Sequence, residues 1–332
     1  MSHISALHEI MATRVWLATP SLVHATRDIF ISNVNQRKPI EDIVASAREL
    51  SVIPSLSCKS PITFHAAGSE KSNGSDEANE VEDAQGYHAI DTVITDPYTH
   101  EEIPTFIHVM EVRGGILRNS GACSDGSMDQ RDELIRSTND GALAHIIIVN
   151  SGGGQCDSLL DYEDGINYCR DHGQPVVAFV RGMACSCAYG LSAMTDWITA
   201  SSRVDCVGCI GAMGAGFTIK DGDENAVSHE TYRELYATKS VNKNIIHREI
   251  SQGEYSKWQA SLDEWEERFN AIVTKYRPSV QDDQKDGLDF DAGSVVGTLV
   301  DEVGDFQSAY EKAMQLAQDL QLSTRKNGTK AQ

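Results

Sequence analysis

The alternation of apolar runs, glycine-containing segments and helical periods between residues 144 and 200 constrains the fold most strongly. Residues 144–149 form a continuous apolar run, typical of a strand buried on both faces. A glycine-rich turn at 150–154, a helical period closed by Gly173 and a second apolar run at 175–180 follow. Strand, turn, helix and strand in this order are typical of a right-handed parallel crossover, so the sequence predicts an α/β fold with a parallel sheet and βαβ units.

Other segments extend this pattern in both directions. Strands are predicted at 90–94, at 105–112 (ending at Gly114), at 197–200 and at 206–213, and helices at 129–139, at about 186–194 and at 304–317. A long helix before Pro278 carries a stripe of aromatic and aliphatic residues at helical spacing, which we interpret as core or subunit interface.

The chain divides into four parts. Residues 1–67 are predicted to form a small helical N-terminal segment, with breaks at its prolines, and residues 68–86 an acidic flexible linker that lacks large apolar side chains. Residues 87–322 then form the main domain, and residues 323–332 a polar tail.

The charge balance excludes some classes of partner. The chain has 28 Lys and Arg against 49 Asp and Glu, a formal charge of -21, which argues against nucleic acid and against an anionic membrane surface. No apolar run reaches the roughly 18 residues that a membrane span needs, and Glu9 and Arg14 interrupt the start of the chain. We therefore expect a cytoplasmic protein with no membrane partner.

The eight cysteines do not form a disulfide framework in so long a chain. Cys185-x-Cys187 and Cys206-x-x-Cys209 are spaced as zinc ligands could be, but both pairs lie in Gly/Ala-rich apolar stretches with no histidine nearby. Neither a Gly-Lys-Ser/Thr loop nor a Gly-x-Gly-x-x-Gly turn is present for a phosphate group. We expect no metal and no cofactor.

Ser186 lies where the strand that begins at Pro175 gives way to a helix. Free amide groups and the positive end of the helix dipole favour an alkoxide and an oxyanion at such a position, although an ordinary N-cap serine occupies the same place. The segment is not the Gly-x-Ser-x-Gly elbow of the α/β-hydrolases, and both neighbours of Ser186 are cysteines. The glycine turn at 150–154 and the Ser186 turn follow adjacent strands, at the edge where open α/β sheets place their sites.

Four segments in order resemble one family: Asn-Ser-Gly-Gly-Gly at 150–154, the Ser186 turn, Gly-Cys-Ile-Gly at 208–211, and Gly-Thr-Leu-Val-Asp-Glu-Val-Gly at 297–304. They are similar to the signal-peptide peptidase A family and its relatives, the phage capsid-maturation (prohead) serine proteases, which share the ClpP-like fold. Two positions depart from the family pattern, with Gly152 in place of Pro and Cys209 in place of Ser. The resemblance spans about residues 106–316 and implies a ClpP/crotonase-like fold and a serine peptidase that uses a Ser-Lys dyad.

The resemblance makes Ser186 the nucleophile. The family's base is a lysine in Gly-x-x-Lys, which Ser240-x-x-Lys243 matches with Ser for Gly, while Lys239 fits only a shortened loop. A lysine base must be neutral, so burial has to lower its pKa from about 10.4. His229 and His247 are weaker candidates for the base.

The oxyanion hole is implied at Gly153, Gly154 and Cys187, through their backbone amides. The expected partner is a protein or peptide substrate. The resemblance implies a phage scaffold or coat protein, cleaved by a homo-oligomeric ring inside a procapsid in the host cytoplasm. Two alternatives stay open on the sequence. A crotonase-like acyl-CoA enzyme also sets two glycine-rich turns around an oxyanion, and a non-catalytic capsid or scaffold component would keep the fold without the activity.

Overall fold

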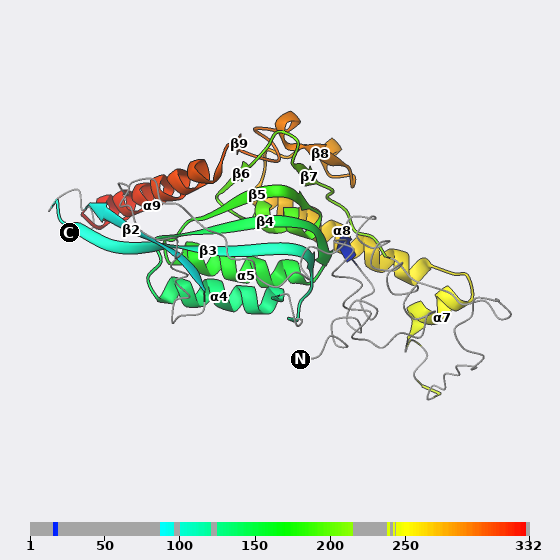
Figure 1. The fold of residues 1–332 in the computed structure, drawn as a ribbon. Helices are drawn as coiled ribbons and strands as arrows, with labels where there is room; N and C mark the ends of the chain where they lie inside the picture. Colours follow the sequence, from blue (N-terminus) through cyan, green and yellow to red (C-terminus); the bar gives the residue numbers. More distant parts are fainter. Residues whose placement is uncertain are drawn as a thin grey trace, which may run out of the picture.

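The computed structural model describes residues 16–18, 87–95, 100–120, 125–214, 238–239, 242 and 244–329. A twisted mixed sheet lies at the centre, with α4, α5, α6 and α8 on one face and α9 on the other (Figure 1). This arrangement confirms the predicted α/β class.

The main path of the sheet runs β2-β3-β4-β5-β6-β9. Strands β3 to β6 and β9 are parallel, whereas β2 is antiparallel to β3. Beyond this path, β7 runs parallel to β5, β8 pairs antiparallel with β7, and β1 pairs antiparallel with β4. The bounds are β1 Trp16–Ala18, β2 His88–Thr95, β3 Glu102–Ile116, β4 Ala144–Gln155, β5 Val176–Cys185, β6 Trp197–Ala200, β7 Cys206–Gly208, β8 Asp289–Asp291 and β9 Glu302–Val303.

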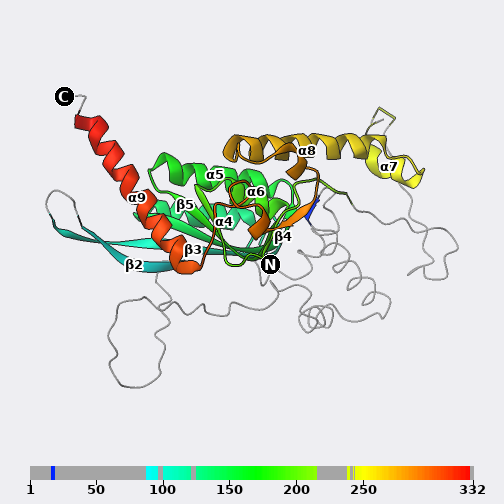
Figure 2. The ribbon, with the colours of Figure 1, turned by 90° about the horizontal axis from the view of Figure 1, so that it is seen from above.

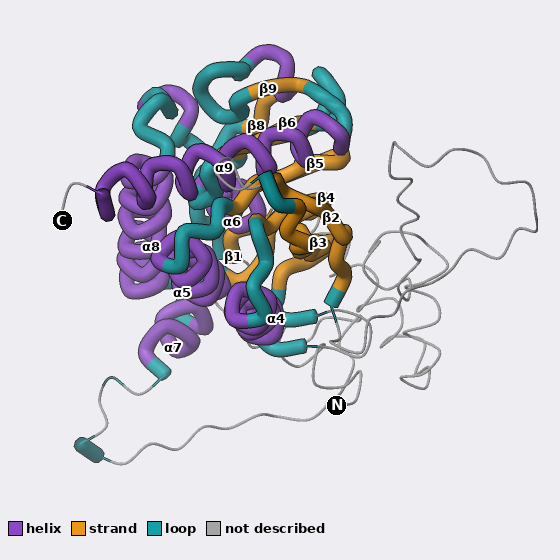
Figure 3. Tube along the Cα trace, turned by 90° about the vertical axis from the view of Figure 1, so that its left-hand side faces the viewer, coloured by secondary structure: helices purple, strands orange, loops and turns teal. Residues whose placement is uncertain are grey.

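Helices cover both faces of this sheet. Figure 2 shows α8 lying along the face that also holds α5 and α6, with α7 at its far end, away from the sheet. Figure 3 shows α4 and α5 side by side on the same face. The helices are α4 Ser127–Asn139, α5 Ser158–Asp171, α6 Cys187–Ala193, α7 Ile245–Ser251, α8 Ser256–Tyr276 and α9 Phe306–Thr329, with short 3-10 turns at Asp282–Gln284 and Ala292–Ser294.

The apolar run of β4 fills both layers of the core. Ile147 and Val149 pack towards α5 and α6, while Ile146 and Ile148 pack towards the small-residue face of α9. The alternation follows from the two-residue period of a strand, and it explains why the run is apolar on both faces apart from His145 near its start. The aromatic stripe of α8 joins the first of these clusters through Phe269, which is buried, whereas Tyr255 just before the helix is exposed.

The glycine segment that the sequence predicts as a turn at 150–154 is part of β4. Residues 151–155 are not a turn but continue β4, and the partner strand β3 likewise runs through Gly114 to Ile116. The register between the two strands shifts between Arg113 and Gly115, and Gly153 adopts a φ of +99°. Glycine therefore serves here to keep an irregular strand paired, because it tolerates a backbone that other residues rarely adopt.

Two further boundaries were predicted wrongly. Trp16–Ala18 is a strand rather than part of a helix, since its pairing with β4 overrides local preference; the rest of the N-terminal segment and the linker lie outside the described residues. The final helix continues past 317 to Thr329, because no glycine or proline interrupts it before Gly328.

Candidate active site

Ser186 joins β5 to α6 in a strained backbone conformation. Its φ is +55° and its ψ is -124°, a combination that residues with a Cβ rarely adopt. A sharp strand-to-helix turn of this kind presents the nucleophile in α/β-hydrolases. The turn forms although both neighbours are cysteines, and Cys185 and Cys187 are both fully buried.

The Ser186 side chain has no visible structural role. It is fully buried, and its hydroxyl makes no hydrogen bond within the described part of the chain, nor does it cap α6. An unpaired buried hydroxyl costs free energy and a strained φ adds to that cost, so an ordinary N-cap does not account for this residue. Such outliers cluster at functional sites.

Strand β7 holds the Ser186 turn in place through backbone hydrogen bonds. The Ser186 amide donates to the Gly208 carbonyl over 2.7 Å, and Gly208 pairs with Cys185 in the parallel ladder. Cys209, the next residue, has a φ of +51°, and its amide donates to the Leu288 carbonyl over 2.7 Å. The 208–211 motif thus lies directly against the Ser186 turn.

The 297–304 motif supports the site from a distance. The Tyr189 hydroxyl of α6 donates to the Leu299 carbonyl over 3.1 Å, and the Asp301 carboxylate accepts from the Ile198 amide over 2.7 Å. Asp301 also pairs with Arg277 over 2.9 Å. The motif therefore anchors α6 and closes the β6 edge of the sheet, which is a structural role.

The end of β4 lies beside this turn. Ser151 pairs with Ala184 two residues before Ser186, and the Cys187 thiol contacts the Gln155 carbonyl over 3.4 Å. The glycine segment and the Ser186 turn are thus brought together, as the sequence predicted.

The side chain of Ser151 organises the end of β4. Its buried hydroxyl donates to the Gly114 carbonyl and accepts a hydrogen bond from the Gly153 amide over 3.1 Å. Sequence reasoning assigned no role to this hydroxyl, although a serine two residues before a glycine is a recognisable backbone-capping signal.

Gly154 is required by close packing. A Cβ at this position would stand 1.9 Å from the Ile116 carbonyl oxygen of the neighbouring strand. Only glycine fits, and both Gly153 and Gly154 are buried.

The cysteines around Ser186 behave as protonated fillers. Burial raises the pKa of the Cys187 thiol, and a hydrogen bond with Cys206 together with burial raises that of Cys185. Burial raises the pKa of Cys209 to about 11. Metal ligation needs thiolates, and the described residues contain no group of three or more His, Cys, Asp or Glu placed to hold a metal ion.

The candidate bases are only partly located. Lys239 lies exposed in a turn between two undescribed stretches, and the Ser186 hydroxyl makes no hydrogen bond to it. Lys243 and His229 lie outside the described residues, and His247 is placed only through the backbone of α7.

A buried histidine pair was missed by the sequence analysis. The Nδ1 atoms of His108 and His145 lie 3.1 Å apart, and burial lowers the pKa of each to about 3. His145 is next to the start of β4, while the candidate site is at its end, so the pair belongs to the core rather than to the site.

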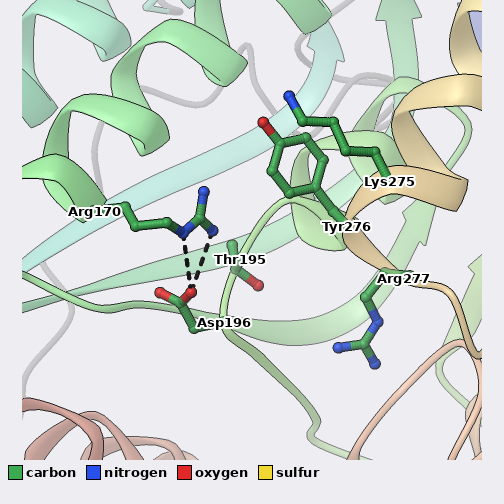
Figure 4. Close-up of a pocket in the computed structure, with 6 residues that line it drawn as sticks. All are labelled: Arg170, Thr195, Asp196, Lys275, Tyr276 and Arg277. Atoms are coloured by element: carbon green, nitrogen blue, oxygen red, sulfur yellow. Dashed lines mark hydrogen bonds and ion pairs between the residues drawn. The ribbon is translucent and has the colours of Figure 1, made fainter. Parts of the chain in front are cut away.

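A surface cavity of about 430 Å³ also lies away from Ser186 (Figure 4). It is lined by Thr195 and Asp196, which follow α6, whereas Ser186 precedes that helix. Its cations Arg170, Lys275 and Arg277 are each paired with a carboxylate, so the cavity offers no free positive charge to an anion.

The comparisons define the class of this domain. Residues 169–320 match the model of peptidase family S49. The match contains Ser186 and the 208–211 and 297–304 motifs, and it begins after β4. It confirms the resemblance to the signal-peptide peptidase A family.

Individual relatives follow from further comparisons. The chain is 26% identical to Protease 4 of Haemophilus influenzae over 238 residues, which are 69% of this chain and 38% of that protein. Among solved structures it is similar to the 1510-N membrane-bound stomatin-specific protease, with a TM-score of 0.35 and 15% identity over 62% of this chain and 83% of that one. An enoyl-CoA hydratase from Polaromonas sp. JS666 gives a TM-score of 0.34 and 13% identity over 69% of this chain and 76% of that one.

Within the described residues, no helix combines the length and apolar character that crossing a bilayer requires.

Proposed function

We propose that the protein is a serine endopeptidase in which Ser186 is the nucleophile and Lys243 the general base. One observation carries the proposal: a serine inside the S49 match is held buried, strained and unpaired within the described residues, beside the glycine-rich end of β4. The S49 match also favours a peptidase over the acyl-CoA alternative.

The chemistry proceeds by acyl transfer. The Ser186 Oγ attacks the substrate carbonyl while its proton moves to the neutral Lys243 Nζ, which then protonates the leaving amine. Water next attacks the acyl-enzyme, gives a proton to Lys243 and releases the carboxylic acid, and Ser186 regains its proton.

The oxyanion is held by backbone amides. Cys187 is the first residue of α6, where amides lack partners within the helix. Gly153 and Gly154 supply the other amides, and the Ser151 hydroxyl holds the Gly153 amide until an oxyanion replaces it.

Cleavage assays with single variants test the roles. Ser186→Ala should abolish cleavage of a denatured protein substrate while leaving the thermal unfolding cooperative. Lys243→Ala should lower kcat by at least about 10², and Lys239→Ala, the matched control, should change it less than about twofold. Retained cleavage by Ser186→Ala would overturn the mechanism, and equal small losses in the two lysine variants would exclude both as the base.

We propose further that the substrate is a scaffold or coat protein of a phage capsid and that the enzyme works as a homo-oligomeric ring. The motif resemblance to prohead proteases supports this role, and the exposed start of α8 offers a surface for subunit contact. Co-expression with the neighbouring genes, followed by mass-spectrometric mapping of cut sites, tests it. Cuts in a capsid protein that need Ser186 support the role, and their absence contradicts it.

A further inference from the structure

We propose that β1 occupies the place of a bound peptide substrate, so that Trp16–Ala18 is an intramolecular competitor that substrate has to displace. This inference rests on the proposed function and concerns the regulation of the same site. It is argued from the pairing of Trp16–Ala18 with the end of β4.

The two edges of β4 differ in how far their partner strands extend. Up to Val149, the strand is flanked by β3 on one edge and β5 on the other. After Ser151 pairs with Ala184, β5 leaves this ladder and turns into α6 at Ser186. Strand β3 continues along its own edge as far as Gly154.

Strand β1 fills the edge of β4 that β5 leaves. Ala18, Leu17 and Trp16 pair with Gly153, Gly154 and Gln155. Because β3 already takes the other edge of Gly153 and Gly154, β1 lies on the edge that faces the Ser186 turn. Figure 1 shows β1 in dark blue at the end of the sheet where β4 and β5 finish.

An extended peptide is the kind of ligand that fits this edge of β4. The pairing is antiparallel and uses main-chain groups, which every extended peptide offers. Adding a strand to an exposed edge is a general mode of peptide recognition. Ala18 lies opposite Gly153, a candidate oxyanion donor, so the occupant runs past the atoms that a scissile peptide bond has to meet.

A substrate peptide has to displace β1 from the edge of β4. A three-residue strand contributes few hydrogen bonds, and such short edge pairings open easily. If β1 fills the edge in about nine molecules of ten, the apparent affinity for a peptide falls about tenfold. An external substrate then binds at a rate and affinity set by the opening of β1.

The experiment measures peptide binding in the absence of catalysis. A fluorescein-labelled peptide with the sequence of residues 11–22 is titrated, by anisotropy, into full-length protein that carries Ser186→Ala. Trp16→Pro and Leu17→Pro are added separately, because consecutive amides of a strand point to opposite sides and proline removes the amide. Leu17→Ala is the control that keeps the backbone pairing.

One proline variant should bind the peptide about tenfold more tightly than the control, with an unchanged cooperative thermal transition. Equal affinities in both proline variants and the control, or no binding in any, would overturn the inference. Fluorophosphonate labelling of protein with Ser186 intact reports separately on the proposed function, so the two failures are distinguishable.

Discussion

Replacing Ser151 by alanine should loosen the end of β4 and slow catalysis together. The side chain is fully buried, and it ties the Gly114 carbonyl of β3 to the Gly153 amide of β4. Its removal deletes two hydrogen bonds and leaves two buried backbone groups without this partner. At about 1 kcal/mol for each bond, plus part of the desolvation cost of the stranded groups, the loss is about 2–3 kcal/mol.

Thermal unfolding and steady-state kinetics measure the two effects. For a domain of this size the loss corresponds to a fall in Tm of about 4–10 °C. Because the Gly153 amide loses its orientation, kcat should fall by up to about 10², with KM changed much less.

Ser192→Ala is the matched control. That serine is equally buried, but its hydroxyl donates only to the Ala188 carbonyl of the same helix over 2.8 Å. Its loss should cost less than about 1 kcal/mol and leave kcat unchanged. If Ser151→Ala lowered Tm no more than this control and kept full kcat, the hydroxyl would have no part in positioning the β4 amides.

Two further predictions concern stability. His108 and His145 stay neutral in the folded protein down to about pH 3, whereas the unfolded chain protonates them near pH 6.5. The free energy of unfolding should therefore fall as pH drops through this window, by up to about 1.4 kcal/mol per pH unit for each histidine. His145→Asn should lower this slope in urea titrations at several pH values, and an unchanged slope would contradict the assignment. Gly154→Ala places a Cβ against the Ile116 carbonyl and should lower the free energy of unfolding by more than about 3 kcal/mol. Gly173→Ala, at a φ of +73° with open space around the Cβ, should lower it by about 1 kcal/mol. Equal losses in the two variants would show that β3 and β4 separate readily at Gly154.

The core elements could be predicted because their patterns are local. The apolar run at the start of β4 and the helical period closed by Gly173 each specify their own structure, and both lie where the sequence placed them. The parallel pairing of β4 with β5 follows from the crossover between them.

The site could be predicted only in part, because its geometry depends on contacts distant in sequence. The positive φ of Ser186 is held by β7 and by the packing of α6, and the usual elbow pattern is absent because Ala184 and Ala188 stand in place of its two glycines. The role of glycine in continuing β4 depends on the close approach of Ile116, and the pairing of β1 depends on an edge that only the folded sheet creates.

The most direct test of the account locates the nucleophile chemically. The full-length protein is treated with a fluorophosphonate probe, digested, and searched by mass spectrometry for the modified residue. We expect a single adduct on Ser186, absent from the Ser186→Ala variant and retained in the Ser192→Ala control. No adduct under conditions that label a reference serine peptidase, or an adduct on another serine that persists in Ser186→Ala, would contradict the assignment of Ser186 as the nucleophile.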